Sequence, residues 1–84
     1  MDISEVRIRR IEQESKLKAV ASITIDNAFV IHDIKVIEGD NGLFIAMPSK
    51  KGSDGEFRDI CHPISSSVRD ELKVRIIEEY NKTN

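Results

Sequence analysis

The chain has few aromatic residues, one cysteine and no long apolar run, and each shortage excludes a class of protein. It has no Trp, one Tyr and three Phe in 84 residues, which leaves little aromatic surface for stacking on nucleic-acid bases. A single Cys cannot form a disulfide within the chain, so a reducing compartment fits. No apolar run approaches the roughly 18 residues of a membrane span, and Met1-Asp2-Ile3 does not begin a signal segment. We therefore expect a cytoplasmic protein that does not enter a membrane.

The chain also lacks an excess of positive charge. It has 13 Lys and Arg against 15 Asp and Glu, which gives a formal net charge of −2. This balance argues against a protein that coats nucleic acid by bulk electrostatics, although a local basic patch remains compatible with it. Hydrophobic residues make up 39% of the chain and charged residues 33%, a globular composition. We expect one small domain over residues 1–84, stabilised by oligomerisation because a lone core of this size is marginal.

Residues 1–62 have the pattern of short β-strands separated by turns. The clearest strand is 17–26, in which apolar and polar residues alternate. Further strands are expected at 6–9, 29–37, 43–47 and 56–62. The segment Gly39-Asp40-Asn41-Gly42 predicts a tight turn, because Gly and Asn tolerate positive φ. It has neither the spacing nor the Lys-Ser/Thr of a phosphate-binding loop. Residues 48–55 predict a polar loop with Lys50 and Lys51 at its tip.

Residues 64–82 have the pattern of an amphipathic helix. The serines Ser65, Ser66 and Ser67 offer N-cap oxygens, with Asp70 as a capping-box partner of Ser67. An apolar stripe then recurs every four residues, at Val68, Leu72, Ile76 and Tyr80. The fold class is therefore α+β: an antiparallel sheet of about five strands followed by a C-terminal helix packed on one face. The other face, or a sheet edge, is then available to a dimer partner.

The residues that carry chemistry do not form a recognisable site. A metal site would rest on His32, Cys61 and His62, but Cys61 and His62 are neighbours on an expected strand and would point to opposite faces. Zinc needs about four convergent ligands. A Cys–His nucleophile pair would lack an evident oxyanion hole and a water-excluding pocket. We therefore expect no enzyme, no metal, no cofactor and no small-molecule substrate.

The basic residues form the candidate binding site. They lie in the expected loop, in the strand that leaves it and on one flank of the helix stripe: Lys50, Lys51, Arg58, Arg69 and Lys73. We expect the helix acids Asp70, Glu71 and Glu78 to lie on the opposite side, so that the segregated cations could bind phosphates. Two alternatives remain open: the cations could cover apolar surface in a protein-interaction module, or Arg7, Arg9 and Arg10 could replace the helix as the binding surface.

One long block resembles the signature of a known family. The segment Phe-Val-Ile-His-Asp-Ile-Lys-Val-Ile-Glu-Gly-Asp-Asn-Gly-Leu-Phe-Ile-Ala-Met-Pro-Ser-Lys at 29–50 is similar to that of the stage V sporulation protein G family. Flanking matches lie at 6–10, 21–25, 55–60 and 62–64, so the resemblance covers essentially the whole chain. The chain departs from the pattern at Cys61, where Ala is usual, and at Ser65, where Asn is common.

The resemblance implies a small bacterial cytoplasmic regulator that affects gene expression, sporulation and asymmetric septation. Members of the family are described as homodimers that bind DNA and, in some cases, RNA. Lys50, Lys51, Arg58 and Arg69 match basic positions of the family pattern, whereas Lys73 rests mainly on helical geometry. The alternative function is a protein-interaction module in division-site control that does not bind nucleic acid.

Overall fold

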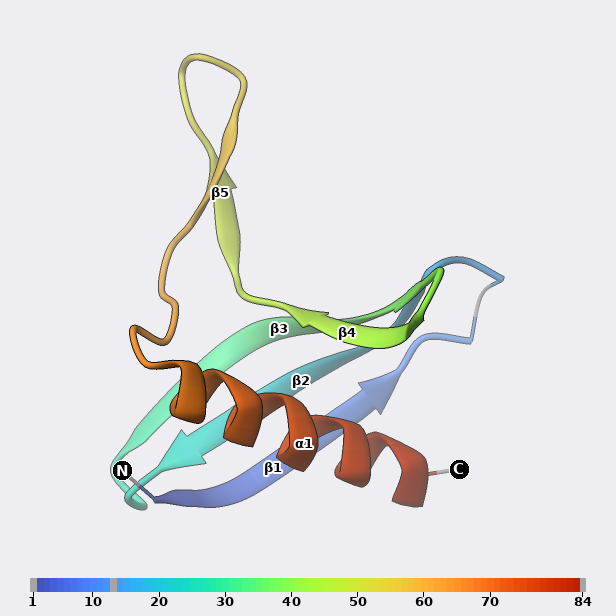
Figure 1. Ribbon diagram of the computed structural model, residues 1–84, viewed down its shortest axis with the longest axis vertical. Coiled ribbons are helices and arrows are strands. Elements are labelled where there is room, and N and C mark those ends of the chain that lie inside the picture. The colour runs from blue at the N-terminus through green and yellow to red at the C-terminus, as the bar shows by residue number, and fades with distance from the viewer. Residues whose placement is uncertain (1, 13, 84) are drawn as a thin grey trace.

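The fold combines an antiparallel sheet, a separate hairpin and one C-terminal helix (Figure 1). The computed structural model describes residues 2–12 and 14–83. In chain order the elements are β1 (Ile3–Arg10), β2 (Leu17–Ile25), β3 (Phe29–Gly39), β4 (Gly42–Ala46), β5 (Ser49–Lys51), β6 (Phe57–Asp59) and α1 (Ser66–Lys82). Within the described ranges, no helix is long and apolar enough to cross a membrane. The expected α+β class, with a terminal helix on an antiparallel sheet, is confirmed.

Strands β1 to β4 form a four-stranded meander in the order β1-β2-β3-β4. The expected tight turn joins β3 to β4: Gly39 pairs with Gly42, and Gly42 has a φ of +115°. A bulge interrupts the β2–β3 ladder between the pairs Ala21–Ile34 and Ile23–Ile31. Asp33, which lies in this bulge, has a φ of +65°, a left-handed conformation that Asp adopts more readily than most residues.

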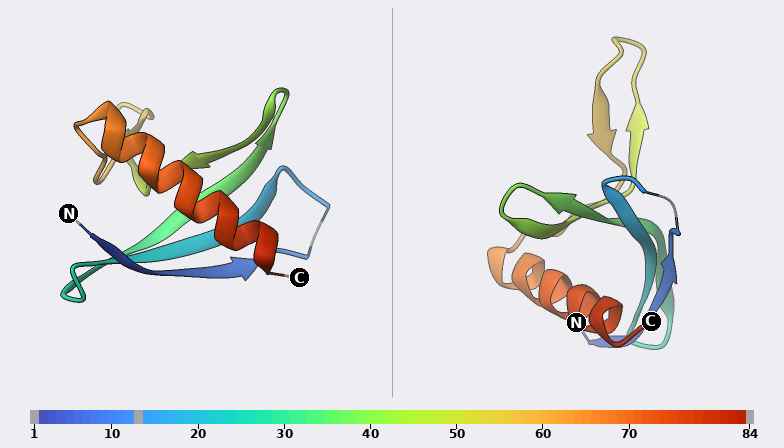
Figure 2. Two further views of the ribbon diagram at one scale, coloured as in Figure 1. Left: turned by 60° about the horizontal axis from the view of Figure 1, so that its bottom comes forward. Right: turned by 90° about the vertical axis from the view of Figure 1, so that its right-hand side faces the viewer.

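The core lies between α1 and one face of the sheet (Figure 2). It is built by alternate strand residues and by the apolar helix stripe, with these buried members: Ile3, Ala19, Ala21, Ile23, Ile34, Val36, Leu72 and Ile76. Val68 and Tyr80 pack against this cluster from the two ends of the stripe. The i, i+4 pattern of the helix therefore correctly identified the face that α1 buries.

The last expected strand does not join the main sheet. Strand β6 pairs only with β5, and together they form a two-stranded hairpin arm that projects from the body (Figure 1). Two predictions of local structure were therefore wrong. Residues 48–55 are not all loop, because Lys50 and Lys51 lie in β5 rather than at the tip. Residues 60–62 are not strand: the Ile60 amide donates to the Pro48 carbonyl at 2.7 Å and closes the base of the arm.

The helix begins at the first of the three serines that were expected to offer N-cap oxygens. Ser65 is the N-cap, and its hydroxyl accepts a hydrogen bond from the Val68 amide at 3.4 Å. Ser67 already lies inside the helix, so the expected pairing of Ser67 with Asp70 is wrong. Three consecutive serines gave no local signal for choosing among them, since each is a favoured N-cap residue.

Candidate nucleic-acid interface

Three of the five candidate cations lie on the hairpin arm. Lys50 lies opposite Arg58 in the β5–β6 ladder, and Lys51 lies opposite Phe57. All residues of both strands are exposed. Directly opposed residues of an antiparallel pair point to the same face, so Lys50 and Arg58 present two positive charges side by side. The short arm therefore brings together cations that are separated by seven or eight residues in the sequence.

An internal ion pair restrains Arg58. Its guanidinium contacts the Asp54 carboxylate at 2.6 Å and 3.3 Å, and the same carboxylate accepts a hydrogen bond from the Glu56 amide at 3.1 Å. These contacts favour the ionised form, so Arg58 first, and then the Glu56 amide, hold the pKa of Asp54 below its ordinary value. Asp54 thus orients the Arg58 guanidinium across the turn of the arm and neutralises part of its charge.

The arm as a whole has balanced charge. Its three cations are matched in number by Asp54, Glu56 and Asp59. Among the residues that the structure describes, no ion pair involves Lys50 or Lys51. These two ammonium groups are therefore the cations of the arm that an external phosphate would meet without first displacing a carboxylate.

The remaining two candidates lie near the start of α1. Arg69 and Lys73 are exposed, and both line a shallow hollow with Phe44, Ile45, Met47 and Pro63. The Arg69 guanidinium donates to the Pro63 carbonyl at 3.4 Å. The chain returns from the arm directly into α1 (Figure 1), so this end of the helix lies near the base of the arm. The structure thus places all five candidates on the arm and on the helix turns that follow it.

The expected separation of helix charges is wrong. Asp70 and Glu78 line a surface hollow together with Lys73, around the apolar side chains of Val74 and Ile77. Successive residues on a helix are turned by about 100°, which places Asp70 only about 60° from Lys73. The acids therefore reduce the positive potential at Lys73. They reduce the potential at Arg69 less.

The three arginines of β1 have different roles. The Arg10 guanidinium lies 4.1 Å from the centroid of the Tyr80 ring, and it donates to the carbonyls of Tyr80 at 3.0 Å and Thr83 at 2.6 Å. It therefore caps the C-terminal end of α1. Arg7 and Arg9 point to the sheet face that α1 does not cover, and Arg7 contacts Glu5 at 3.3 Å. Arg10 is thus occupied by a structural role, whereas Arg7 and Arg9 remain exposed.

The residues considered for metal or nucleophilic chemistry do not converge. The Nδ1 atom of His32 lies 3.0 Å from the Ser22 hydroxyl. Cys61 and His62 lie outside any strand and line one small apolar hollow beside Pro63 and Leu72, so the expectation that they point to opposite faces is wrong. In the described part of the chain, no group of three or more His, Cys, Asp or Glu is placed to hold a metal ion.

The interface also contains apolar residues that the sequence patterns had assigned to other roles. Phe57, Ile60 and Ile64 are 70%, 68% and 96% exposed, on the arm and on the connection to α1. Sequence reasoning placed Phe57 and Ile60 in a further strand of the sheet, at 56–62. Their exposure next to Lys51 and Arg58 gives the arm both apolar and cationic surface.

Comparison with known proteins identifies the family. A family model described as SpoVG matches residues 1–82. The chain belongs to the SpoVG family. It is 62% identical over 80 residues to the "Putative septation protein SpoVG" of Lachnoclostridium phytofermentans, covering 95% of this chain and 86% of that protein. It is 61% identical to the proteins of the same name from Agathobacter rectalis and Lachnospira eligens, covering 95% and 98% of this chain and 92% and 93% of theirs. The resemblance found in residues 29–50 is thereby confirmed.

Proposed function

We propose that this SpoVG-family chain is a homodimeric regulator that binds the phosphate backbone of DNA, and also of RNA, through the hairpin arm and the first turns of α1. The observation that carries the proposal is the placement of Lys50 and Lys51 on an exposed arm with no carboxylate partner in the described structure. Arg58, Arg69 and Lys73 extend this surface toward the body of the protein. Phosphate contacts of this kind position a protein on nucleic acid without selecting a sequence.

The overall charge of the protein shapes the expected binding. The chain has a formal net charge of −2, so the arm attracts phosphates against the field of its own body. Binding by one arm alone would therefore be weak. A homodimer presents two arms, and affinity rises steeply with the number of phosphates neutralised. We expect moderate affinity that falls linearly with salt concentration on a log–log plot.

The test is fluorescence anisotropy with labelled duplex DNA and with labelled RNA at several salt concentrations. Changing both Lys50→Ala and Lys51→Ala should weaken binding to every probe and make the salt slope less steep by about two per arm engaged. A matched control changes Lys16→Ala and Lys35→Ala, two exposed lysines outside the arm, and should alter binding much less. Equal losses in the two double variants, or no binding by the parent protein at low salt, would refute the proposal.

The exposed apolar side chains of the arm favour one alternative function. Clusters of exposed apolar residues mark protein interaction sites, and Phe57, Ile60 and Ile64 are well exposed beside the cations. The arm would then bind another protein. Complexes that survive nuclease treatment and are lost on Phe57→Ser with Ile60→Ser, but not on the double lysine change, would support this alternative.

The name of the relatives bears on the biological role. The matched proteins of three bacteria are each named putative septation protein. This name supports a role for the present chain in septation, which a regulator of gene expression and a protein-interaction module could both fulfil. Complexes that nuclease destroys would indicate the nucleic-acid-binding regulator. Complexes that survive nuclease would indicate the protein-interaction module.

A further inference from the structure

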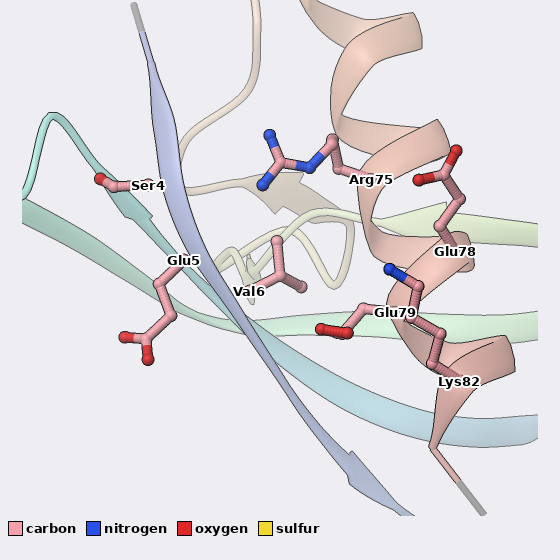
Figure 3. Close-up of a pocket in the computed structure, with 7 residues that line it drawn as sticks. All are labelled: Ser4, Glu5, Val6, Arg75, Glu78, Glu79 and Lys82. Atoms are coloured by element: carbon pink, nitrogen blue, oxygen red, sulfur yellow. The ribbon is translucent and has the colours of Figure 1, made fainter.

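Strand β1 forms an open edge of the main sheet. It is the first strand in the order β1-β2-β3-β4, and among the strands that the structure describes it pairs only with β2. Its eight residues contain neither Pro nor Gly, the residues that most often protect a sheet edge or interrupt it. A bulge interrupts its ladder to β2 between Ile3 and Glu5, and the strand is regular from Glu5 to Arg10. An edge strand offers a row of backbone donors and acceptors to another strand. Figure 3 shows β1 beside α1, with the Val6 side chain directed toward the helix and Glu5 directed away from it.

The ladder with β2 determines which backbone groups of β1 face outward. The Ile11 amide donates to the Lys18 carbonyl at 2.9 Å, and the same register continues through the pairs Arg9–Val20 and Arg7–Ser22. In an antiparallel ladder, alternate residues direct their N–H and C=O groups to the same neighbour. Those of Arg9 and Arg7 therefore point toward β2, whereas those of Val6 and Ile8 point to the open edge.

We propose that β1 pairs with β1 of a second copy of this chain, around a two-fold axis at Val6. This pairing rests on the homodimer of the proposed function and assigns its interface. Val6 then exchanges backbone hydrogen bonds with the partner's Val6, at the centre of the two strands and within the regular segment 5–10. The two four-stranded sheets become one continuous sheet, with the arms at its far edges.

The charges of β1 select this register. With the axis at Val6, Glu5 lies opposite the partner's Arg7, and Arg7 lies opposite the partner's Glu5. Moving the axis by one residue keeps the backbone hydrogen-bond pattern but changes the opposed charges. An axis at Glu5 places two Glu5 side chains opposite each other, and an axis at Arg7 places two Arg7 side chains opposite each other. Like charges directly opposite each other destabilise a sheet. Within one chain Glu5 and Arg7 contact each other at 3.3 Å, but they are 52% and 78% exposed, so they can exchange this solvated contact for the pairs across the axis.

The space beside the edge fits an incoming strand. A surface cleft of about 340 Å³ lies between β1 and α1, as Figure 3 shows. It is lined from the strand by Ser4, Glu5 and Val6, and from the helix by Arg75, Glu78, Glu79 and Lys82. The helix side carries two cations and two carboxylates, so the same surface on two copies is complementary to itself. An isologous interface requires this property.

The test is the mass in solution, measured by light scattering after size-exclusion chromatography. The parent protein should have a mass of about 19 kDa, twice the 9.5 kDa of one chain. Glu5→Arg should oppose two Arg at each contact, and Arg7→Glu two Glu. Each change reverses two symmetry-related pairs and should weaken dimerisation at least tenfold. An equimolar mixture of the two variants restores opposite charges at both contacts and should form dimers again.

A matched control is Arg9→Glu, which makes the same charge change on the same face of β1 but lies outside the two Glu5–Arg7 pairs of the proposed interface. It should remain dimeric, and circular dichroism should show that all variants are folded. A monomeric parent protein, single variants as dimeric as the parent, or a mixture that stays monomeric would each overturn the proposed pairing.

Anisotropy on the same samples separates this proposal from the proposed function. A parent protein that binds nucleic acid while the charge variants remain dimeric would reject only the β1 pairing. A dimer that responds to the charge changes as expected but binds no DNA or RNA would reject only nucleic-acid binding.

Discussion

The contact between Arg10 and the end of α1 predicts a large loss of stability from a single surface substitution. The Arg10 guanidinium donates to two carbonyls in the last turn and C-cap of the helix and lies over the Tyr80 ring. The Tyr80 carbonyl also accepts from the C-cap Thr83 amide at 3.2 Å, so Arg10 is its second donor. A cation at this end of the helix also interacts favourably with the helix dipole. We expect Arg10→Ala to lower the free energy of unfolding substantially.

The size of the loss follows from the contacts. A hydrogen bond from a charged donor contributes about 1.5–3 kcal/mol, and an exposed cation–π contact about 0.5–1 kcal/mol. Arg10 is only half-buried, so solvent screening and water at the freed carbonyls reduce the total. We expect a loss of about 2 kcal/mol, which lowers the Tm of a chain of this size by roughly 8–16 °C. Arg10→Lys retains the charge, and because a single Arg10 nitrogen donates to both carbonyls, a Lys ammonium could replace those bonds but not the planar guanidinium over the Tyr80 ring. Its loss should therefore be about half as large.

Urea unfolding followed by circular dichroism measures this difference, at one fixed protein concentration because dimerisation would couple to stability. Arg9→Ala is the matched control, since Arg9 lies next in sequence but points to the uncovered face, and it should change stability by less than about 0.5 kcal/mol. Equal losses for Arg10→Ala and Arg9→Ala would refute the capping role. In a protein that already carries Tyr80→Leu, Arg10→Ala should cost less unfolding free energy, and the difference should equal only the cation–π contribution of about 0.5–1 kcal/mol.

Three further predictions test the core, the bulge and the arm. Ile76 is fully buried, so Ile76→Ala should cost about 2–5 kcal/mol in urea unfolding, and Ile77→Ala, at a half-buried position, clearly less. Asp33 has a φ of +65°, so Asp33→Gly should preserve or raise the Tm, whereas the β-branched change Asp33→Val should lower it. Because Arg58 lowers the pKa of Asp54, the pair stabilises the arm above the unfolded pKa of about 3.8 and is lost as the pH falls through the lower folded value. An NMR titration of the Asp54 carboxyl should show this midpoint moving up toward the ordinary value in Arg58→Gln, and an unchanged midpoint would contradict the pairing.

Local sequence patterns predicted most of the body of the fold. Alternation located β2, the apolar run at 29–37 located β3, the Gly39–Gly42 segment located the turn between β3 and β4, and the i, i+4 stripe located the buried face of α1. Each of these features depends on residues within a few positions of one another. Side-chain direction and φ preference therefore encode them directly.

The candidate site was less predictable because it depends on which strands pair. Nothing in Ser49-Lys50-Lys51 resembles a strand, since the segment has no apolar alternation. It becomes β5 only because Phe57–Asp59 folds back on it instead of extending the main sheet. The five candidate cations were identified from the sequence, but their placement along an arm and at its base, and the exposure of Phe57 and Ile60, were not.

The sequence by itself determined most of the elements of this protein, its α+β class and its family, because periodicity, turn residues and a long signature block are local properties of the chain. Only the tertiary structure decided that the last strand forms a projecting arm, that Arg10 caps a helix end 70 residues away in the sequence, and that β1 is left as an open edge. These outcomes depend on competition between distant segments for the same backbone and side-chain partners, which no local pattern encodes.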